Sequence, residues 1–119
     1  MSRPTPRKDL NLFSEYRNVW LFTLFDLPVE TNENKRAYLH FRKFLLRQGF
    51  SMLQYSVYAR FCASEESAEA FRRRLRIRLP DDGHVRLLSV TDRQFGKMEI
   101  FFGKKAREPE KEPEQLLLF

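Results

Sequence analysis

The sequence is poor in the residues that build disulfides, zinc sites and phosphate-binding loops. Its 119 residues include one cysteine, Cys62, two histidines and four glycines. A lone cysteine forms no internal disulfide and has no second cysteine to complete a zinc-type pair. Four scattered glycines supply no glycine-rich phosphate loop. These absences exclude disulfide scaffolds, zinc fingers and nucleotide-binding loops, and we expect Cys62 to be a buried, inert thiol.

Long apolar runs are also missing. No stretch approaches the ~20 apolar residues that a membrane span needs, and the first residues, MSRPTPRKDLNLF, contain no apolar segment of the signal type. We therefore expect a cytoplasmic protein with no membrane partner. The chain is 42% apolar and carries a formal net charge of +6. This composition predicts one compact domain whose surface attracts phosphate backbones.

The most apolar segment ends in a carboxylate. Residues 18–26, NVWLFTLFD, are rich in aromatic and branched side chains and are followed by Leu27 and Pro28. They predict a strand buried on both faces, with Asp26 at its carboxyl end. Asp26 has two interpretations. It is either a turn residue that accepts backbone hydrogen bonds, or a carboxylate that meets its copy across a two-fold axis and holds a hard divalent cation.

Two amphipathic helices are predicted. Thr31 or Asn32 can cap the first, which ends at Gly49, and Ser64 caps the second. Apolar and neutral positions at steps of three and four define their buried stripes: Ala37, Tyr38, Phe41, Phe44, Leu45 and Gln48 in the first, and Ala68, Phe71, Leu75 and Leu79 in the second.

The remaining segments predict strands. Residues 50–62 fit two paired strands or one long bent strand, and residues 84–92 and 97–103 read as two strands joined by a short loop around 93–96. The order is that of an α+β, ferredoxin-like β-α-β-β-α-β domain with an additional C-terminal strand. Its antiparallel sheet carries both helices on one face.

The chain divides into three parts on this pattern. We expect an N-terminal extension over residues 1–17, the ferredoxin-like domain over 18–103, and a charged linker with an apolar tail over 104–119. The linker, up to residue 114, should be extended and mobile. Both faces of the first strand are apolar, so the sheet face opposite the helices needs cover. A homodimer packed sheet to sheet would provide it.

Cationic residues recur along the first predicted helix. Arg36, Lys43 and Arg47, together with His40, lie at offsets of four, three and four, with Lys35 close beside them. The stripe is either a solvated outer face or a surface that neutralises nucleic-acid phosphates. The arginines that end the second predicted helix receive less weight, because the helix dipole and snorkelling account for part of them. The two histidines show no metal-ligand spacing.

The chain ends in an apolar tail. Leu116, Leu117, Leu118 and Phe119 follow the charged linker. We expect them to add as a strand to a sheet edge of this chain or of a partner, in preference to a frayed end.

A resemblance to a known family is carried by three segments: VWLFTLFDLPVET, KRAYLHFRKFLLRQGFSMLQYSVYAR and TDRQFGKMEIFFGKK. Together they resemble the CRISPR-associated endoribonuclease family, the smaller of the two universal CRISPR adaptation proteins, and in particular its members from type II systems. The match runs from about residue 18 to residue 105, and the tail EQLLLF is also similar. The aromatic-Asp-apolar-Pro step and the later Q-aromatic-S-V-aromatic segment are its most specific parts.

The resemblance implies a homodimer at the centre of a complex with two dimers of the larger adaptation protein, the integrase, which inserts short duplex DNA prespacers into the CRISPR array. It also implies Mg²⁺-dependent nuclease activity on DNA or RNA, with Asp26 as the catalytic residue and magnesium ligand. The alternative function is a free-standing, toxin-like endoribonuclease. The tethered apolar tail favours the adaptor.

Overall fold

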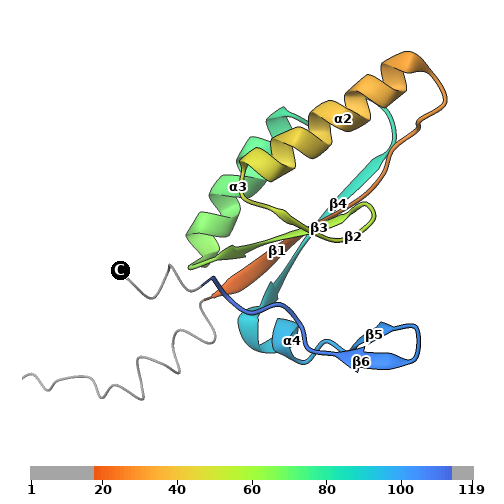
Figure 1. Cartoon of the computed structure of the whole chain (residues 1–119). Helices are drawn as coiled ribbons and strands as arrows, with labels where there is room; N and C mark the ends of the chain where they lie inside the picture. Colours follow the sequence, from red (N-terminus) through yellow and green to blue (C-terminus); the bar gives the residue numbers. More distant parts are fainter. Residues whose placement is uncertain (1–17, 114–119) are drawn as a thin grey trace, which may run out of the picture.

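A computed structural model of the chain describes residues 18–113 (Figure 1). The elements in chain order are β1 (Val19–Asp26), α2 (Asn32–Arg47), β2 (Ser51–Gln54), β3 (Val57–Cys62), α3 (Glu65–Ile77), β4 (His84–Thr91), α4 (Asp92–Gly96), β5 (Ile100–Phe102) and β6 (Lys105–Arg107). The first six reproduce the predicted β-α-β-β-α-β order, with residues 50–62 forming two paired strands.

The main sheet has four strands in the order β2-β3-β1-β4. β1 pairs antiparallel with both β3 and β4, so it lies in the centre of the sheet. Four of its apolar side chains are buried, from Val19 to Phe25, and Thr23 between them is fully buried too. The predicted strand is confirmed, but its second face is covered only in part, because Phe22 and Leu24 are half-buried. The fold is α+β and consistent with a ferredoxin-like domain.

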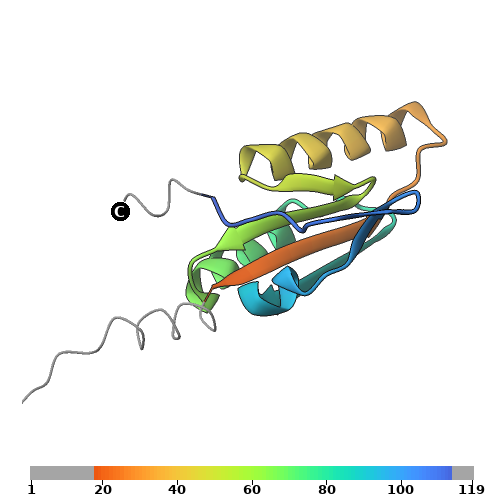
Figure 2. The same ribbon diagram turned by 60° about the horizontal axis from the view of Figure 1, so that its bottom comes forward.

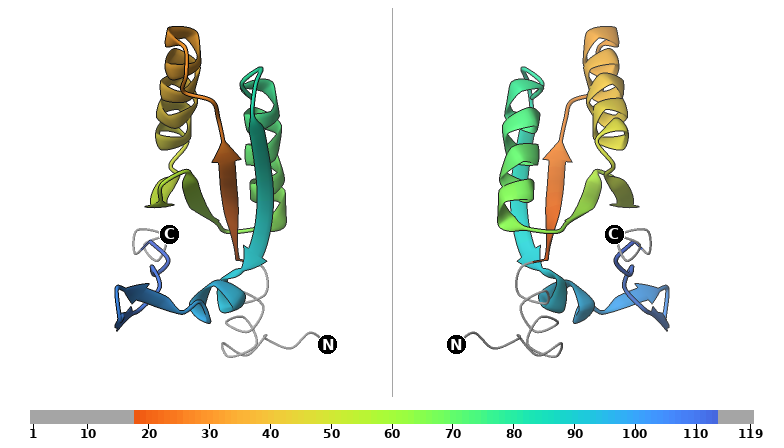
Figure 3. Two further views of the ribbon diagram at one scale, coloured as in Figure 1. Left: turned by 90° about the vertical axis from the view of Figure 1, so that its right-hand side faces the viewer. Right: turned by 90° about the vertical axis from the view of Figure 1, so that its left-hand side faces the viewer.

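Both helices cover one face of this sheet (Figures 1 and 3). The side chain of Thr31 accepts a hydrogen bond from the backbone N–H of Asn34, and Ser64 does the same for Ser67, so both helices begin at predicted caps. The main core lies between helices and sheet. It includes Phe41, Phe44 and Leu45 from α2, Ala68, Phe71 and Leu75 from α3, and Leu21, Tyr58 and Cys62 from the sheet.

One predicted stripe residue in each long helix is not buried. Ala37 of α2 is exposed, and so is Leu79 after α3. The α3 helix ends at Ile77, and Leu79 lies beyond it with 42% of its surface exposed. Pro80 is the cause, because a residue that precedes proline is disfavoured in the helical conformation. The stripe therefore stops at Leu75.

The opposite face of the sheet is partly covered by the chain's own C-terminal region. The loop expected around residues 93–96 is instead the short helix α4, which starts with a capping box formed by Thr91 and Gln94. Phe95 of α4 is buried and stacks on Trp20, with the ring centroids 4.0 Å apart. The Trp20 indole N–H donates to the Asp92 carboxylate at 2.7 Å. A dimer is therefore not needed to cover this half of the face.

The last two strands also differ from the prediction. β5 is shorter than the expected strand at 97–103, and it pairs with β6 in a separate two-stranded sheet (Figure 2). β6 occupies part of the expected extended linker. The chain reverses direction after β5 because Gly103 and Lys104 form a two-residue hairpin turn, in which Gly103 has φ +60°. Glycine accepts this left-handed conformation without strain. The predicted strand at Leu116–Phe119 lies outside the described residues.

Candidate nucleic-acid and metal site

Asp26 is the last residue of β1, and its side chain is exposed. Alternation along the strand puts it on the same face as Trp20 and Leu24, opposite the helices. α4 and the β5–β6 hairpin lie near the start of β1 and leave the Asp26 end of this face open (Figure 3). Within residues 18–113 no hydrogen bond or ion pair is found for the Asp26 carboxylate. The turn-residue interpretation therefore receives no support from the described contacts.

Two residues of the turn and strand that follow α3 lie against Asp26. His84, the first residue of β4, is its direct partner in the sheet register, and directly opposed side chains lie on the same face. Gly83 packs against the Asp26 backbone with φ +94°; a Cβ there would lie 2.5 Å from the Asp26 carbonyl oxygen. Only a residue without a side chain allows β4 to start this close to Asp26.

A single chain supplies only part of a metal site here. Within residues 18–113 no group of three or more His, Cys, Asp or Glu side chains could hold a metal ion. Mg²⁺ is commonly bound in proteins by one or two carboxylates, with waters and substrate phosphates completing its shell. An exposed Asp26 on an open face fits this requirement if a second copy or a phosphate supplies further oxygens.

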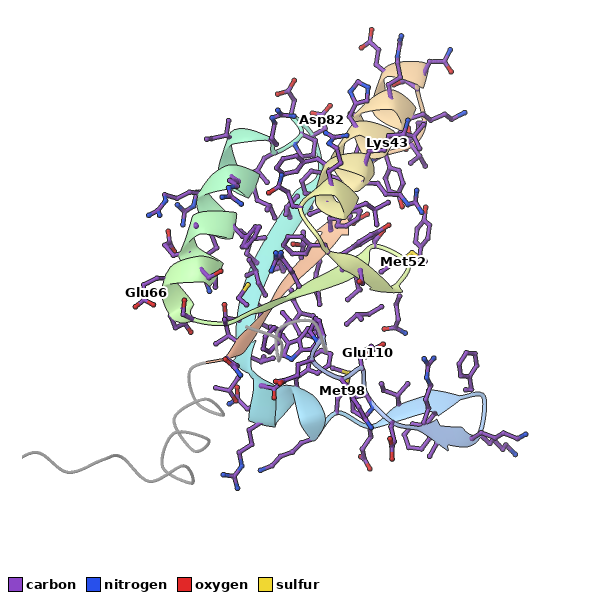
Figure 4. The ribbon with its side chains drawn as sticks, turned by 60° about the vertical axis from the view of Figure 1, so that its left-hand side comes forward. Lys43, Met52, Glu66, Asp82, Met98 and Glu110 are labelled. Atoms are coloured by element: carbon purple, nitrogen blue, oxygen red, sulfur yellow. The ribbon has the colours of Figure 1, made fainter. Side chains whose placement is uncertain are left out.

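The sheet face opposite the helices and the hairpin beside it carry exposed apolar side chains. Leu88 of β4 is 53% exposed, and Phe101 of β5 is 59% exposed. A groove of about 300 Å³ runs between the sheet and the β5–β6 hairpin. Met98 and Glu110 line it on the side away from the helices (Figure 4). This surface is apolar enough to mark an interface.

The four predicted nucleic-acid-binding residues are exposed on α2. Because successive residues turn by about 100° around a helix, Arg36, Lys43 and Arg47 lie within a narrow sector, whereas Lys35 points about a quarter turn away. His40, at one side of this sector, lines a groove of about 350 Å³ between α2 and the end of α3, whereas the three cations do not line it. The predicted set therefore occupies two edges of α2 rather than one stripe.

Three of the four arginines of α3, and two arginines near it, have partners within the chain. Arg72 contacts Ser89 and Glu69, and Arg76 pairs with Glu69 at 3.2 Å. The Arg74 guanidinium lies 4.8 Å from the centroid of the Phe71 ring, and Arg60 of β3 lies 4.0 Å from the same centroid. Arg78 lies over Phe44 in the same manner, at 5.1 Å. The sequence interpretation that gave these arginines less weight agrees with these contacts.

Three pKa shifts reflect these surroundings. The hydrogen bond from Arg76, helped by the charge of Arg72, holds the pKa of Glu69 below its ordinary value. Burial raises the pKa of the Cys62 thiol, which confirms the expected buried, inert cysteine. The hydrogen bond and charge of Tyr38 raise the pKa of Tyr55.

Sequence reasoning missed one neighbour of Asp26. His84 shows no ligand spacing along the chain, yet the register puts it beside Asp26. The ferredoxin-like strand order was the available signal, since it places the start of the last sheet strand against the end of the first. The predicted partner-binding residues Leu116–Phe119 lie outside the described part of the chain.

The chain is similar to known proteins over most of its length. Within residues 18–113 no helix is long and apolar enough to cross a membrane. The family model for CRISPR associated protein Cas2 matches residues 19–98. A protein of Flavobacterium psychrophilum named CRISPR-associated endoribonuclease Cas2 is 48% identical over 106 residues, which cover 89% of this chain and 92% of that protein.

Proteins of the same name give similar values. The one from Parvibaculum lavamentivorans is 46% identical, covering 85% of this chain and 100% of that protein. The one from Ligilactobacillus salivarius is 42% identical, covering 82% and 97%. The match includes β1 with Asp26, both long helices and the complete main sheet. The chain is therefore a member of the CRISPR-associated Cas2 family.

Proposed function

We propose that this chain is a homodimeric adaptor of CRISPR spacer acquisition, which binds a duplex DNA prespacer between integrase dimers and carries a Mg²⁺-dependent phosphodiesterase centre at Asp26. The observation that carries the proposal is the position of Asp26, exposed at the end of the central strand on a sheet face that is apolar and half open. Family membership directs the choice of nucleic acid as the substrate class.

The dimer follows from the open half of the sheet. Leu88 and Phe101 leave most of their surface in water in one copy, and burial of such side chains against a second copy is favourable by ~25 cal/mol per Å². A two-fold axis through this face brings the two Asp26 carboxylates together. Two like charges at short range favour a shared cation.

At such a centre the cation would supply charge neutralisation of the scissile phosphate and an activated water. The chain's own contribution is positioning. Gly83 lets β4 lie against the Asp26 backbone, and the register fixes His84 beside it. The exposed carboxylate is thereby presented from the end of a rigid strand rather than from a loop.

Duplex binding is assigned to the sector of α2 that holds three exposed cations. Arg36, Lys43 and Arg47 have exposed side chains, and their charge fits the phosphate backbone of a duplex. The apolar tail Leu116–Phe119 is assigned to the integrase, by strand addition to an open sheet edge.

RNA cleavage is the second candidate activity. The relatives are named endoribonucleases, and the Asp26 centre as proposed acts on a phosphodiester in either polymer. The cleavage assay decides between them.

The test measures Mg²⁺-dependent cleavage of single-stranded RNA and of duplex DNA, together with the dimer mass by light scattering. Asp26→Ala should abolish cleavage and leave the dimer intact, because an exposed strand-end side chain contributes little to the core. Asp82→Ala is the matched control, since Asp82 is an exposed acid in the turn before Gly83. Equal cleavage by wild type and Asp26→Ala, or a monomeric wild type at micromolar concentration, would refute the respective part of the proposal.

A further inference from the structure

β4 brings an arginine to the sheet face that carries Asp26. The register pairs Asp26 with His84, the first residue of β4. Val85 and Leu87 pack against the core that lies under the two long helices. Because side chains alternate between the two faces of a strand, His84 and Arg86 point to the opposite face. Arg86 therefore lies two residues from the partner of Asp26 and on the same side of the sheet.

Asp26 and Arg86 are diagonal neighbours on two paired strands. Arg86 is the register partner of Leu24, two residues before Asp26. Trp20 and Phe22, which share the alternation of Asp26, belong to the apolar cluster on the side away from the long helices. Diagonal neighbours in an antiparallel pair lie about 7–8 Å apart, and long side chains span that distance. The regular ladder of β1 and β4 (Figure 3) therefore presents a carboxylate and a guanidinium to the same region in front of the sheet.

Neither charge has a partner in one copy of the chain. Asp26 and Arg86 are both exposed, and within residues 18–113 no ion pair or hydrogen bond is found for either side chain. Arg72 and Arg76 of α3 differ in this respect, because both pair with Glu69. Two opposite charges that share a face without a direct contact leave room for a ligand that binds between them.

A phosphodiester group fits between these two charges. Its negative charge is shared by two non-bridging oxygens on different sides of the phosphorus atom. In the proposed centre one oxygen faces the cation at Asp26, and the other requires a second positive group. The guanidinium of Arg86 presents a planar fork of N–H donors that matches phosphate oxygens, and its charge does not titrate. Such a donor also stabilises the charge that develops on the phosphate during cleavage.

We propose that Arg86 anchors the phosphodiester at the Asp26 centre by donating hydrogen bonds to one of its non-bridging oxygens. The inference rests on the proposed function, because it takes Asp26 as the cation-binding end of the same phosphate. It adds a substrate-contacting residue from β4 to a centre that otherwise consists of the end of β1. The cations of α2 remain assigned to the phosphates of the flanking duplex.

The first test measures binding of short single-stranded RNA and duplex DNA to the full-length protein with Ca²⁺ in place of Mg²⁺, under conditions in which no product forms. The affinity of Arg86→Ala should fall by about 10- to 150-fold, the equivalent of ~1.5–3 kcal/mol for a hydrogen bond to a charged group. Arg86→Lys keeps the charge without the fork and should lie between. Arg73→Ala is the matched control. Arg73 is an exposed arginine of α3, and α3 covers the other face of the sheet, so this variant should bind as wild type does.

The second test uses a substrate with sulfur in place of one non-bridging oxygen at the mapped cleavage position, as separate Rp and Sp diastereomers. Wild type and Arg73→Ala should cleave the diastereomer whose sulfur faces Arg86 more slowly than the oxygen substrate. Arg86→Ala should show no such penalty for that diastereomer and should keep the penalty for the other. A merely structural role of Arg86 would not change the two penalties selectively. Urea unfolding and the dimer mass of Arg86→Ala should equal those of wild type, because the side chain is exposed.

Two results would overturn the anchor. One is unchanged affinity and unchanged sulfur penalties in Arg86→Ala, and cleavage that still depends on Asp26 would then leave the proposed function standing. The other is a monomeric Arg86→Ala, which would assign Arg86 to an ion pair between copies. A wild type that cleaves nothing would refute hydrolysis. An ordered loss of affinity from wild type through Arg86→Lys to Arg86→Ala would in that case still support the anchor.

Discussion

The two long helices carry similar positive charge in different states. On α2, the side chains of Lys35, Arg36, Lys43 and Arg47 are exposed, and no ion pair or hydrogen bond is found for them within residues 18–113. On α3 three of the four arginines are held by their own chain. Arg72 and Arg76 pair with Glu69, and Arg74 lies over Phe71. By count the two helices are nearly equal, with five Lys and Arg residues on α2 and four on α3, so the count alone does not separate them.

The two groups of cations differ in whether their side chains already make contacts within the chain. An arginine that already stacks on a ring or pairs with a carboxylate must give up that contact to reach a phosphate, whereas an exposed lysine gives up only water. These three arginines of α3 thus belong to the packing of the helix on the sheet, and the cations of α2 are available to an anionic partner. The predictions below test this division.

The largest expected effect is on the stability of α3. Phe71 is buried, and it is the ring on which both Arg60 and Arg74 rest. Phe71→Ala should lower the free energy of unfolding by about 3–5 kcal/mol, measured by urea denaturation. Leu39→Ala on α2, where the side chain is 47% exposed, should change it by less than about 0.5 kcal/mol. Similar losses in both variants would remove the contrast between the helices.

The second effect is on duplex binding. Replacing Arg36, Lys43 and Arg47 by alanine should weaken binding uniformly across sequences and flatten the dependence of log affinity on log salt by up to about 2.7 units, at ~0.9 per phosphate contact. Binding should be measured on the complex with its integrase. The double variant Arg72→Ala/Arg76→Ala is the control, and a larger change of slope there would reverse the assignment of the two helices.

A smaller effect on stability is expected from Arg60 of β3, which also contacts the Phe71 ring. Arg60 donates from Nε to the Gln48 carbonyl at 2.7 Å and from Nη1 to the Phe61 carbonyl at 2.6 Å, besides its contact with Phe71. Arg60→Ala should lower the free energy of unfolding by about 1–3 kcal/mol. Arg36→Ala should leave thermal and urea unfolding unchanged, and a comparable loss there would show that α2 cations are also structural.

The smallest effect concerns Glu69 and pH. Its pKa is lowered in the folded state by Arg76 and Arg72, so the ionised form contributes stability that is present above the unfolded-state pKa and is lost as pH falls through the folded value. Glu69→Gln should therefore be slightly less stable than wild type at pH 7, and the difference should vanish below about pH 4. A difference that persists at pH 3 would assign the effect to packing.

The sequence was sufficient for elements whose signals are local. The caps at Thr31 and Ser64, the apolar run of β1 and the helical stripes through Phe41 and Phe71 depend on neighbours within a few residues, and all are present. The position of Asp26 at a strand end was predicted for the same reason. The separation of the α2 cations onto two edges of the helix could also have been predicted from the sequence, because it depends only on the helical period.

The errors arise where contacts link distant segments. No residue near Phe95 in the sequence indicates that its ring stacks on Trp20. The sequence therefore predicted a loop in place of α4, and a sheet face opposite the two long helices with no cover from the chain itself. Gly103 is a local signal for the β5–β6 turn. The charged residues that follow it are typical of a linker, so the sequence did not predict β6. His84 and Asp26 are brought together by the strand order alone. Sites built across strands are therefore the least predictable part of this chain.

Gly83 shows how a residue without a side chain can be as constrained as a residue of the proposed Asp26 centre. Any Cβ at this position would meet the Asp26 carbonyl oxygen and the Leu27 side chain, at 2.5 and 2.8 Å. Every substitution must push the start of β4 away from the end of β1 and so displace Asp26, whatever chemistry the new residue brings. In a saturation mutagenesis screen for function, Gly83 would therefore score as intolerant as a residue that touches the substrate, and alanine would fare little better than tryptophan.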